Sequence, residues 1–175
     1  MASFSILSTA LLVVVGFFAW SFLEYLIHGL MSHRWRTFAS PLHWEHHREP
    51  HRVFTSVLVW APSGLLLFLL LAAVLGWQAA GALSGGILIG FLRYEYVHWR
   101  IHFRAPRTAR QELLRRHHLA HHFRNPKAYH GVTTRFWDRV FGTLPASYAE
   151  DYARVAHHPP LVGKSNFGSL WPRRA

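Results

Sequence analysis

The sequence predicts an all-α integral membrane helical bundle, with about three long transmembrane helices and a helical cap on the cytoplasmic side. Two uncharged stretches support this fold class, because no Asp, Glu, Lys or Arg occurs before Glu24 or between Arg52 and Arg93. The first stretch is long enough to cross a bilayer once, and the second is long enough to cross it twice. We expect the spans over residues 3–30, 53–76 and 79–97.

The distribution of cationic residues predicts the orientation of these spans. All 19 Lys and Arg residues lie in the segments 34–52 and 93–174. Under the positive-inside rule the N-terminus then lies outside, and the cap segments 31–52 and 98–148 lie on the cytoplasmic side, in a bacterial inner membrane. Spans and cap form one expected domain over 1–148, followed by a C-terminal tail over 149–175. No nucleic-acid-binding motif accompanies the net charge of +11, so we attribute that charge to contact with anionic lipid headgroups.

The first helix should continue beyond the hydrocarbon core. From Ser3 to His33 it would extend about 45 Å, at about 1.5 Å per residue, against a core of about 30 Å. A short helix should begin at Pro41 and end at Pro50. Pro62 should kink the second span or mark its first turn, because proline lacks the backbone N–H that a helix interior needs.

The third span is rich in small residues. Gly81 and Gly85, and then Gly86 and Gly90, repeat at a spacing that lets helices approach closely in lipid, so these glycines are expected to serve packing. This helix should continue past residue 97 into the cap. A further helix is expected from about Thr108 to Phe123, followed by a loop that contains Gly131 and Gly142.

Histidine is the residue that predicts the chemistry, with 15 copies in 175 residues. Ten of them fall into four short boxes, namely His28-x4-His33, His43-x2-His46-His47, His98-x3-His102 and His118-x2-His121-His122. Imidazole is the commonest metal-ligating side chain, and ten imidazoles are too many for one ion but suit two. The sequence has no cysteine, which excludes haem-thiolate, cysteine-ligated iron–sulfur and cysteine–zinc sites. These observations predict a dinuclear metal site.

The spacing within each box bears on whether its histidines can share an ion. His98 and His102 are four apart and therefore share a helix face. Each three-histidine box should likewise place its imidazoles on a single stripe. His28 and His33, by contrast, lie about 140° apart on an ideal helix, so they converge only if the helix unwinds or bulges, which Gly29 between them would favour.

The remaining histidines and the nearby carboxylates could serve in or around this metal site. His117 could replace His118 as a ligand, and His130 could be a pocket residue or an extra ligand. His51, His157 and His158 are expected on the surface. A ligating imidazole needs a partner for its second nitrogen, and the candidate carboxylates are Glu24, Glu45, Glu95 and Asp138. The alternative for Glu24 and Glu95 is an interfacial salt bridge, for example between Glu95 and an arginine.

The two halves of the chain show a weak internal sequence similarity. Glu24-Tyr25 precedes the first box, Glu95-Tyr96 precedes the third, and each half continues with a three-histidine box. Each half therefore offers five candidate ligands, although this similarity assigns no histidine to a particular metal.

The boxes, together with the segment Tyr129-His-Gly-Val-Thr-Thr-Arg-Phe-Trp-Asp-Arg-Val-Phe-Gly-Thr143, resemble the fatty acid hydroxylase / sterol desaturase superfamily over about residues 20–145. The closing segment looks most like the fatty acid 2-hydroxylase branch. The resemblance implies a non-haem di-metal centre held by the ten box histidines, with iron expected and zinc possible as purified. It implies that this centre activates O2 and inserts one oxygen atom into a lipid C–H bond. Larger members have four spans and a cytochrome b5 domain, so we expect a reduced lid here.

Without a cytochrome b5 domain, electrons are expected from a separate cytochrome b5-, ferredoxin- or rubredoxin-like protein and its reductase. Metals just below the hydrocarbon boundary favour attack near a lipid headgroup, at carbon 2 of an acyl chain. A carotenoid ring hydroxylase acting on β-carotene stays open, because a spanning carotenoid also presents its end ring at the interface. A sterol or lipid desaturase is a further alternative. A non-enzymatic metal transporter is disfavoured, because transporters tend to place ion ligands near the midplane.

Overall fold

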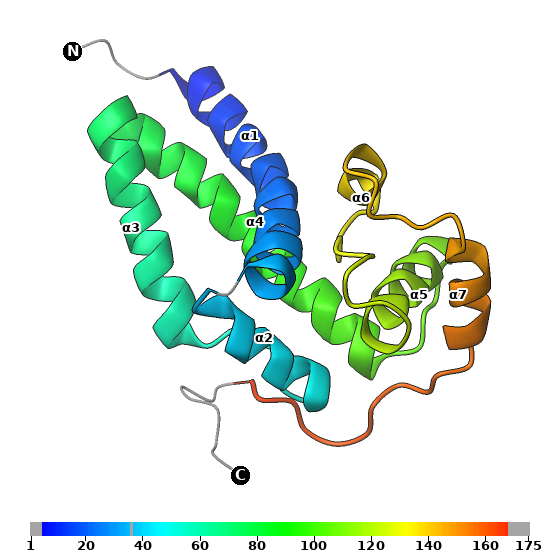
Figure 1. The fold of residues 1–175 in the computed structure, drawn as a ribbon. Coiled ribbons are helices and arrows are strands. Elements are labelled where there is room, and N and C mark those ends of the chain that lie inside the picture. Colours follow the sequence, from blue (N-terminus) through cyan, green and yellow to red (C-terminus); the bar gives the residue numbers. More distant parts are fainter. Residues whose placement is uncertain (1–4, 36, 168–175) are drawn as a thin grey trace. The chain divides into compact units, whose positions relative to one another are not determined.

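A computed structural model describes residues 5–35 and 37–167, and the elements formed by these residues are helices (Figure 1). In chain order they are α1 (Ile6–Tyr25), the π-helix η1 (Leu26–Arg34), α2 (Ala39–Arg48), α3 (Val57–Leu75), α4 (Trp77–Phe103), α5 (Ala109–Phe123), α6 (Phe136–Val140) and α7 (Tyr148–Val155). The all-α prediction is confirmed for this part of the chain.

The chain divides into two compact units. The described part of one, here called the apolar unit, comprises residues 5–21 and 55–93, and the other, here called the histidine unit, comprises 22–54 and 94–167. Helices α1 and α4 each contribute residues to both units. All ten box histidines belong to the histidine unit.

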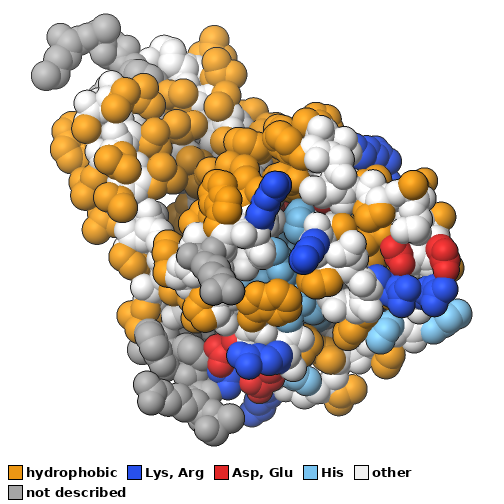
Figure 2. Space-filling view, in the orientation of Figure 1, with side chains coloured by type: hydrophobic (Ala, Val, Ile, Leu, Met, Phe, Trp, Pro, Cys, Tyr) orange, Lys and Arg blue, Asp and Glu red, His pale blue; other side chains and the backbone are white. Residues whose placement is uncertain are grey.

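Two helical segments in the described chain are long and apolar enough to cross a membrane. They are Ile6–Arg34, which joins α1 to η1, and Val57–Leu75, which is α3, and only 6% of each apolar window is buried. Figure 2 shows hydrophobic side chains covering the surface over α1 and α3, where Leu66 and Val74 are 59% and 80% exposed. Such exposure is costly in water and suits lipid. Helix α4 does not meet the same criterion, so the third span stays a prediction.

Two of the four predicted packing glycines in α4 contact α1 closely. A Cβ atom added at Gly86 would lie 2.1 Å from the Val13 carbonyl oxygen, and one at Gly90 would lie 2.4 Å from Trp20 Cβ. An added Cβ at Gly81 or Gly85 would meet no atom within 4 Å. Close packing therefore uses only the second glycine pair, because the first faces away from α1. Pro62 lies inside α3.

The π-helix η1 provides the unwinding that the spacing of the first box requires. The backbone N–H of Trp35 donates to the Leu30 carbonyl at 2.7 Å, five residues back. Hydrogen bonds from residue i+5 to residue i define this helix, and they bring side chains five apart onto one face. The predicted departure from α-helical geometry between the two histidines of this box is confirmed.

Helix α7 was not predicted from the sequence, because we expected residues 149–175 to form a C-terminal tail. Residues 148–155 instead form a helix that packs beside α5 (Figure 1), and residues 168–175 lie outside the described part. Tyr152 and Val155 join a buried cluster with Leu119, Ala120 and Tyr129. The spacing of Tyr148, Tyr152 and Val155 puts these side chains on one helical face, which is the pattern that could have predicted α7.

Candidate metal centre

The ten box histidines gather into two groups of five. The first histidine group is His28, His33, His43, His47 and His121, and the second is His46, His98, His102, His118 and His122. Within each group the candidate ligand nitrogens all lie within 4.8 Å of one another. Both groups lie within the histidine unit, so one compact body positions them.

Each three-histidine box is divided between the two groups, which corrects the expectation of a single stripe. In α2, His43 and His47 enter the first group whereas His46 enters the second. The reason is helical geometry, because residues four apart differ by about 40° around the axis and adjacent residues differ by about 100°. In α5 the division is reversed, since His121 alone enters the first group. Each half of the chain therefore contributes four histidines to one group, and the middle histidine of its three-histidine box to the other group.

Nitrogen–nitrogen distances in both groups match ligands of a common ion. His118 Nε2 lies 3.0 Å from Nε2 of His98, His102 and His122. One ring nitrogen carries either a single hydrogen or a single lone pair, so hydrogen bonds cannot satisfy all three contacts. Two nitrogens bound at right angles to an ion at about 2.1 Å would lie about 3.0 Å apart, so a cation fits this arrangement. In the first group, His47 Nε2 lies 2.9 Å from His43 Nε2 and 3.0 Å from His121 Nε2.

Backbone carbonyls fix the orientation of three of these rings. His28 Nδ1 donates to the His130 carbonyl at 2.5 Å, His121 Nδ1 to the Ala128 carbonyl at 2.8 Å, and His46 Nδ1 to the Arg52 carbonyl at 3.1 Å. Because a carbonyl only accepts, each Nδ1 carries the hydrogen and each Nε2 presents its lone pair to its group. His28 Nε2 is buried without a hydrogen-bond partner among the described residues, as a metal ligand would be.

Burial keeps these imidazoles neutral. It lowers the pKa of His46 to about 4 and that of His47 to about 3, from an ordinary value of 6.5, and it lowers the pKa of His121 well below that value. A neutral imidazole has the lone pair that a metal needs, so protons do not compete for these nitrogens at neutral pH.

Three of the four candidate carboxylates, Glu24, Glu45 and Asp138, contact groups other than the box histidines. Glu24 accepts hydrogen bonds from the backbone N–H groups of Val132 and Thr133 at 2.8 and 2.6 Å. Glu45 forms an ion pair with Arg52, and Glu95 is buried. For the rings of His28, His121 and His46, a backbone carbonyl takes the place expected of a carboxylate. Carbonyl acceptors are common for metal-binding histidine, but no residue type marks them in a sequence.

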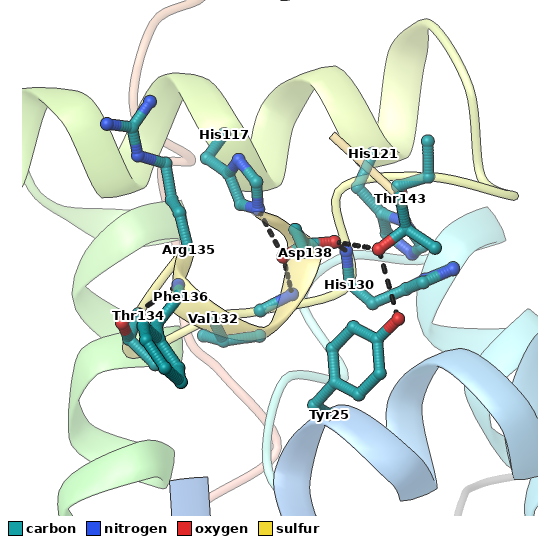
Figure 3. A network of polar contacts seen from close by, with 12 residues as sticks. Tyr25, His117, His121, His130, Val132, Thr134, Arg135, Phe136, Asp138 and Thr143 are labelled. Atoms are coloured by element: carbon teal, nitrogen blue, oxygen red, sulfur yellow. Dashed lines mark hydrogen bonds and ion pairs between the residues drawn. The ribbon is translucent and has the colours of Figure 1, made fainter. Parts of the chain in front are cut away.

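His117 lies in a buried network outside both groups (Figure 3). Its Nδ1 accepts from the Tyr152 hydroxyl at 2.6 Å, and its Nε2 donates to Asp138 Oδ2 at 3.0 Å. Burial lowers the pKa of His117, so the ring is neutral. Both ring nitrogens are engaged, so His117 does not replace its neighbour as a ligand.

His130 lies beside the first histidine group but is not a member of it. Its ring centroid is 5.6 Å from that of His121, and its side chain lies so close to Gly29 that an added Cβ there would be 2.8 Å from the ring. The residue is buried, as a pocket residue would be. His157 and His158 are exposed as expected, and His51 is half-buried, with Nε2 2.9 Å from the Val162 carbonyl.

Comparison with known proteins identifies the family. The sequence model of the fatty acid hydroxylase family matches residues 13–143. The dihydroceramide fatty acyl 2-hydroxylase FAH2 of Arabidopsis thaliana is 34% identical over 146 residues, which are 77% of this chain and 61% of the relative. The Homo sapiens fatty acid 2-hydroxylase is 30% identical over 145 residues, 76% of this chain and 39% of the relative.

A solved structure agrees with these sequence matches. The structure described as full-length scs7p, with only the hydroxylase domain visible, aligns with a TM-score of 0.74 and 27% identity, over 91% of this chain and 61% of that one. The chain spans about three-fifths of the length of the plant relatives that it matches. It belongs to the fatty acid hydroxylase family.

Proposed function

We propose that this protein is an O2-dependent membrane lipid hydroxylase whose two histidine groups hold two metal ions, iron in the working enzyme. The observation that supports this most strongly is the pair of five-imidazole groups, each with its ligand nitrogens within 4.8 Å, in a chain of this family. Bound metals would supply the activation of O2 that oxidation of an unactivated C–H bond requires. Relatives named as fatty acid 2-hydroxylases support carbon 2 of an acyl chain as the position oxidised.

The position of the first group along its helix supports attack near a headgroup. From Ile6 to His28 the helix rises about 33 Å at about 1.5 Å per residue, which is about the thickness of the hydrocarbon core. His28 and His33 therefore reach the headgroup level when the start of α1 lies at the opposite surface. A carbon close to the headgroup reaches this depth without bending of the acyl chain.

We also propose that the first part of α4 forms a third span, and that both histidine groups face the cytoplasm of a bacterial cell. Two electrons per turnover would come from a separate redox protein of the cytochrome b5, ferredoxin or rubredoxin kind. Because the sequence has no cysteine, Ala109→Cys at an exposed position of α5 creates a single thiol. An impermeant thiol reagent should label it only after the cells are opened. Labelling of intact cells would contradict this orientation.

Lipid analysis of a host that expresses the protein tests the function. Membrane lipids should gain a species heavier by one oxygen, with the hydroxyl at carbon 2 of the acyl chain. His98→Ala and His121→Ala, each of which removes one ligand from one group, should abolish this product, whereas His157→Ala at an exposed position should not. Persistence of the product in either ligand variant would refute the site. A product lacking two hydrogens would instead identify a desaturase, and oxidation only of supplied β-carotene would identify a ring hydroxylase.

A further inference from the structure

Asp138 is a fully buried carboxylate with a complete set of hydrogen bonds. Oδ1 accepts from His130 N–H and from Thr143 Oγ1, both at 2.7 Å. Oδ2 accepts from Gly131 N–H at 2.8 Å and from His117 Nε2 at 3.0 Å (Figure 3). Burial opposes its ionisation, but the hydrogen bonds from His117, Thr143 and Gly131 hold its pKa below the ordinary value. A negative charge therefore lies in the interior beside the segment 128–131.

One peptide group joins this carboxylate to the first histidine group. The N–H of Gly131 and the C=O of His130 belong to the same trans peptide, so they point in opposite directions. The N–H end donates to Asp138, and the C=O end accepts from His28 Nδ1 at 2.5 Å. A negative charge at the N–H end polarises the peptide and makes its oxygen a stronger acceptor. The Asp138 charge thus acts on His28 across a single peptide.

The segment that carries this peptide is held in one conformation. Tyr129 has a φ of 60°, in the left-handed region, and its N–H donates to the Thr143 carbonyl at 3.0 Å. A Cβ at Gly131 would lie 1.9 Å from the Thr134 carbonyl oxygen, so the chain passes too close for any side chain there. The carbonyl of Ala128, in the same segment, accepts from His121. Two ligands of the first group therefore take their orientation from this segment.

We propose that Asp138 is a positioning residue for the first histidine group. It holds the carbonyl that orients His28, raises the acceptor strength of that carbonyl, and fixes the segment that orients His121. This inference rests on the proposed two-metal site. The second group has a different support, because His46 donates to the carbonyl of Arg52, whose side chain is paired with Glu45. Loss of the Asp138 charge should therefore weaken one metal site and spare the other.

Metal content of the purified full chain tests the proposal. Asp138→Asn keeps the shape of the side chain and removes its charge, so iron or zinc per chain should fall from two ions to one. Combined with His98→Ala, which damages the second group, Asp138→Asn should leave no bound metal. Combined with His33→Ala, which already damages the first group, it should cause no further loss. Equal loss from both groups would show a merely structural role and would overturn the proposal.

Two further variants keep the test decisive. Thr143→Val removes one of the four hydrogen bonds to Asp138 and should fold even if Asp138→Asn does not. It should accelerate release of one metal to a chelator severalfold and leave the other unchanged. Glu45→Gln weakens the support of the second group. It should therefore reduce the metal content further when combined with His33→Ala, but not when combined with His98→Ala. A wild-type protein that binds no metal would refute the proposed function. Two ions retained in Asp138→Asn, together with an unchanged release rate in Thr143→Val, would refute only this inference.

Discussion

A methyl group added at Gly86 should destabilise the packing of α1 on α4, and the same change one residue earlier should not. An added Cβ at Gly86 would lie 2.1 Å from the Val13 carbonyl oxygen and 2.9 Å from Phe17 N. These are backbone atoms that cannot rotate away, so the helices must separate, and such overpacking costs about 1–3 kcal/mol. At Gly85 the new Cβ meets no atom within 4 Å, and alanine gains up to about 1 kcal/mol in helix propensity.

Thermal unfolding of the detergent-solubilised protein measures the difference. Gly86→Ala should lower Tm and Gly85→Ala should leave it unchanged or raise it. With about 2–4 °C per kcal/mol for a chain of this size, the two variants should differ by several degrees. Both changes add the same methyl group to the same helix, so effects of composition and of the unfolded state nearly cancel. Equal Tm values for the two variants would show that α1 does not pack on α4 through Gly86.

Three further outcomes follow from the histidine unit. The pKa of His46 is about 4 in the folded protein against 6.5 ordinarily, so the unfolded state binds more protons between these values. This residue alone should therefore lower the stability of the metal-free protein by about 3 kcal/mol as pH falls from 6.5 to 4. Denaturant titrations at both pH values that give equal stability would contradict this. Gly29→Ala would place a Cβ 2.8 Å from the His130 ring, so metal analysis should show a weakened first group. Tyr152→Phe should cost about 1–3 kcal/mol in chemical unfolding, because it leaves the buried His117 Nδ1 without its donor.

Features that depend on local helical geometry could be predicted from the sequence. The four-residue spacing of His98 and His102 placed both in one group. The five-residue spacing of His28 and His33 required a departure from the α-helix, and η1 supplies it. Thr108 caps α5 by accepting a hydrogen bond from Gln111 N–H, close to the predicted start of that helix. Each of these features involves residues within one or two helical turns.

Features that depend on contacts between distant segments could not be predicted in the same way. The carbonyls of Ala128 and His130 orient His121 and His28, yet every residue has a carbonyl and no pattern distinguishes these two. Asp138 was expected to support a metal ligand, but its imidazole partner is His117, and only the folded chain shows the peptide that links it to His28. Sequence alone could indicate the carboxylate but not the route by which it acts.

The division of each three-histidine box couples the two groups through shared helices. Because α2 and α5 each carry histidines of both groups, rotation of either helix would displace imidazoles in both at once. The rings of His47 and His122, one from each group, stack with centroids 4.2 Å apart at 18°. The angular offset between neighbouring residues on a helix therefore fixes the separation of the groups. Substitutions that rotate α2 or α5 should alter both groups together, whereas loss of a single carbonyl acceptor should alter one, and this contrast distinguishes a rigid dinuclear centre from two independent sites.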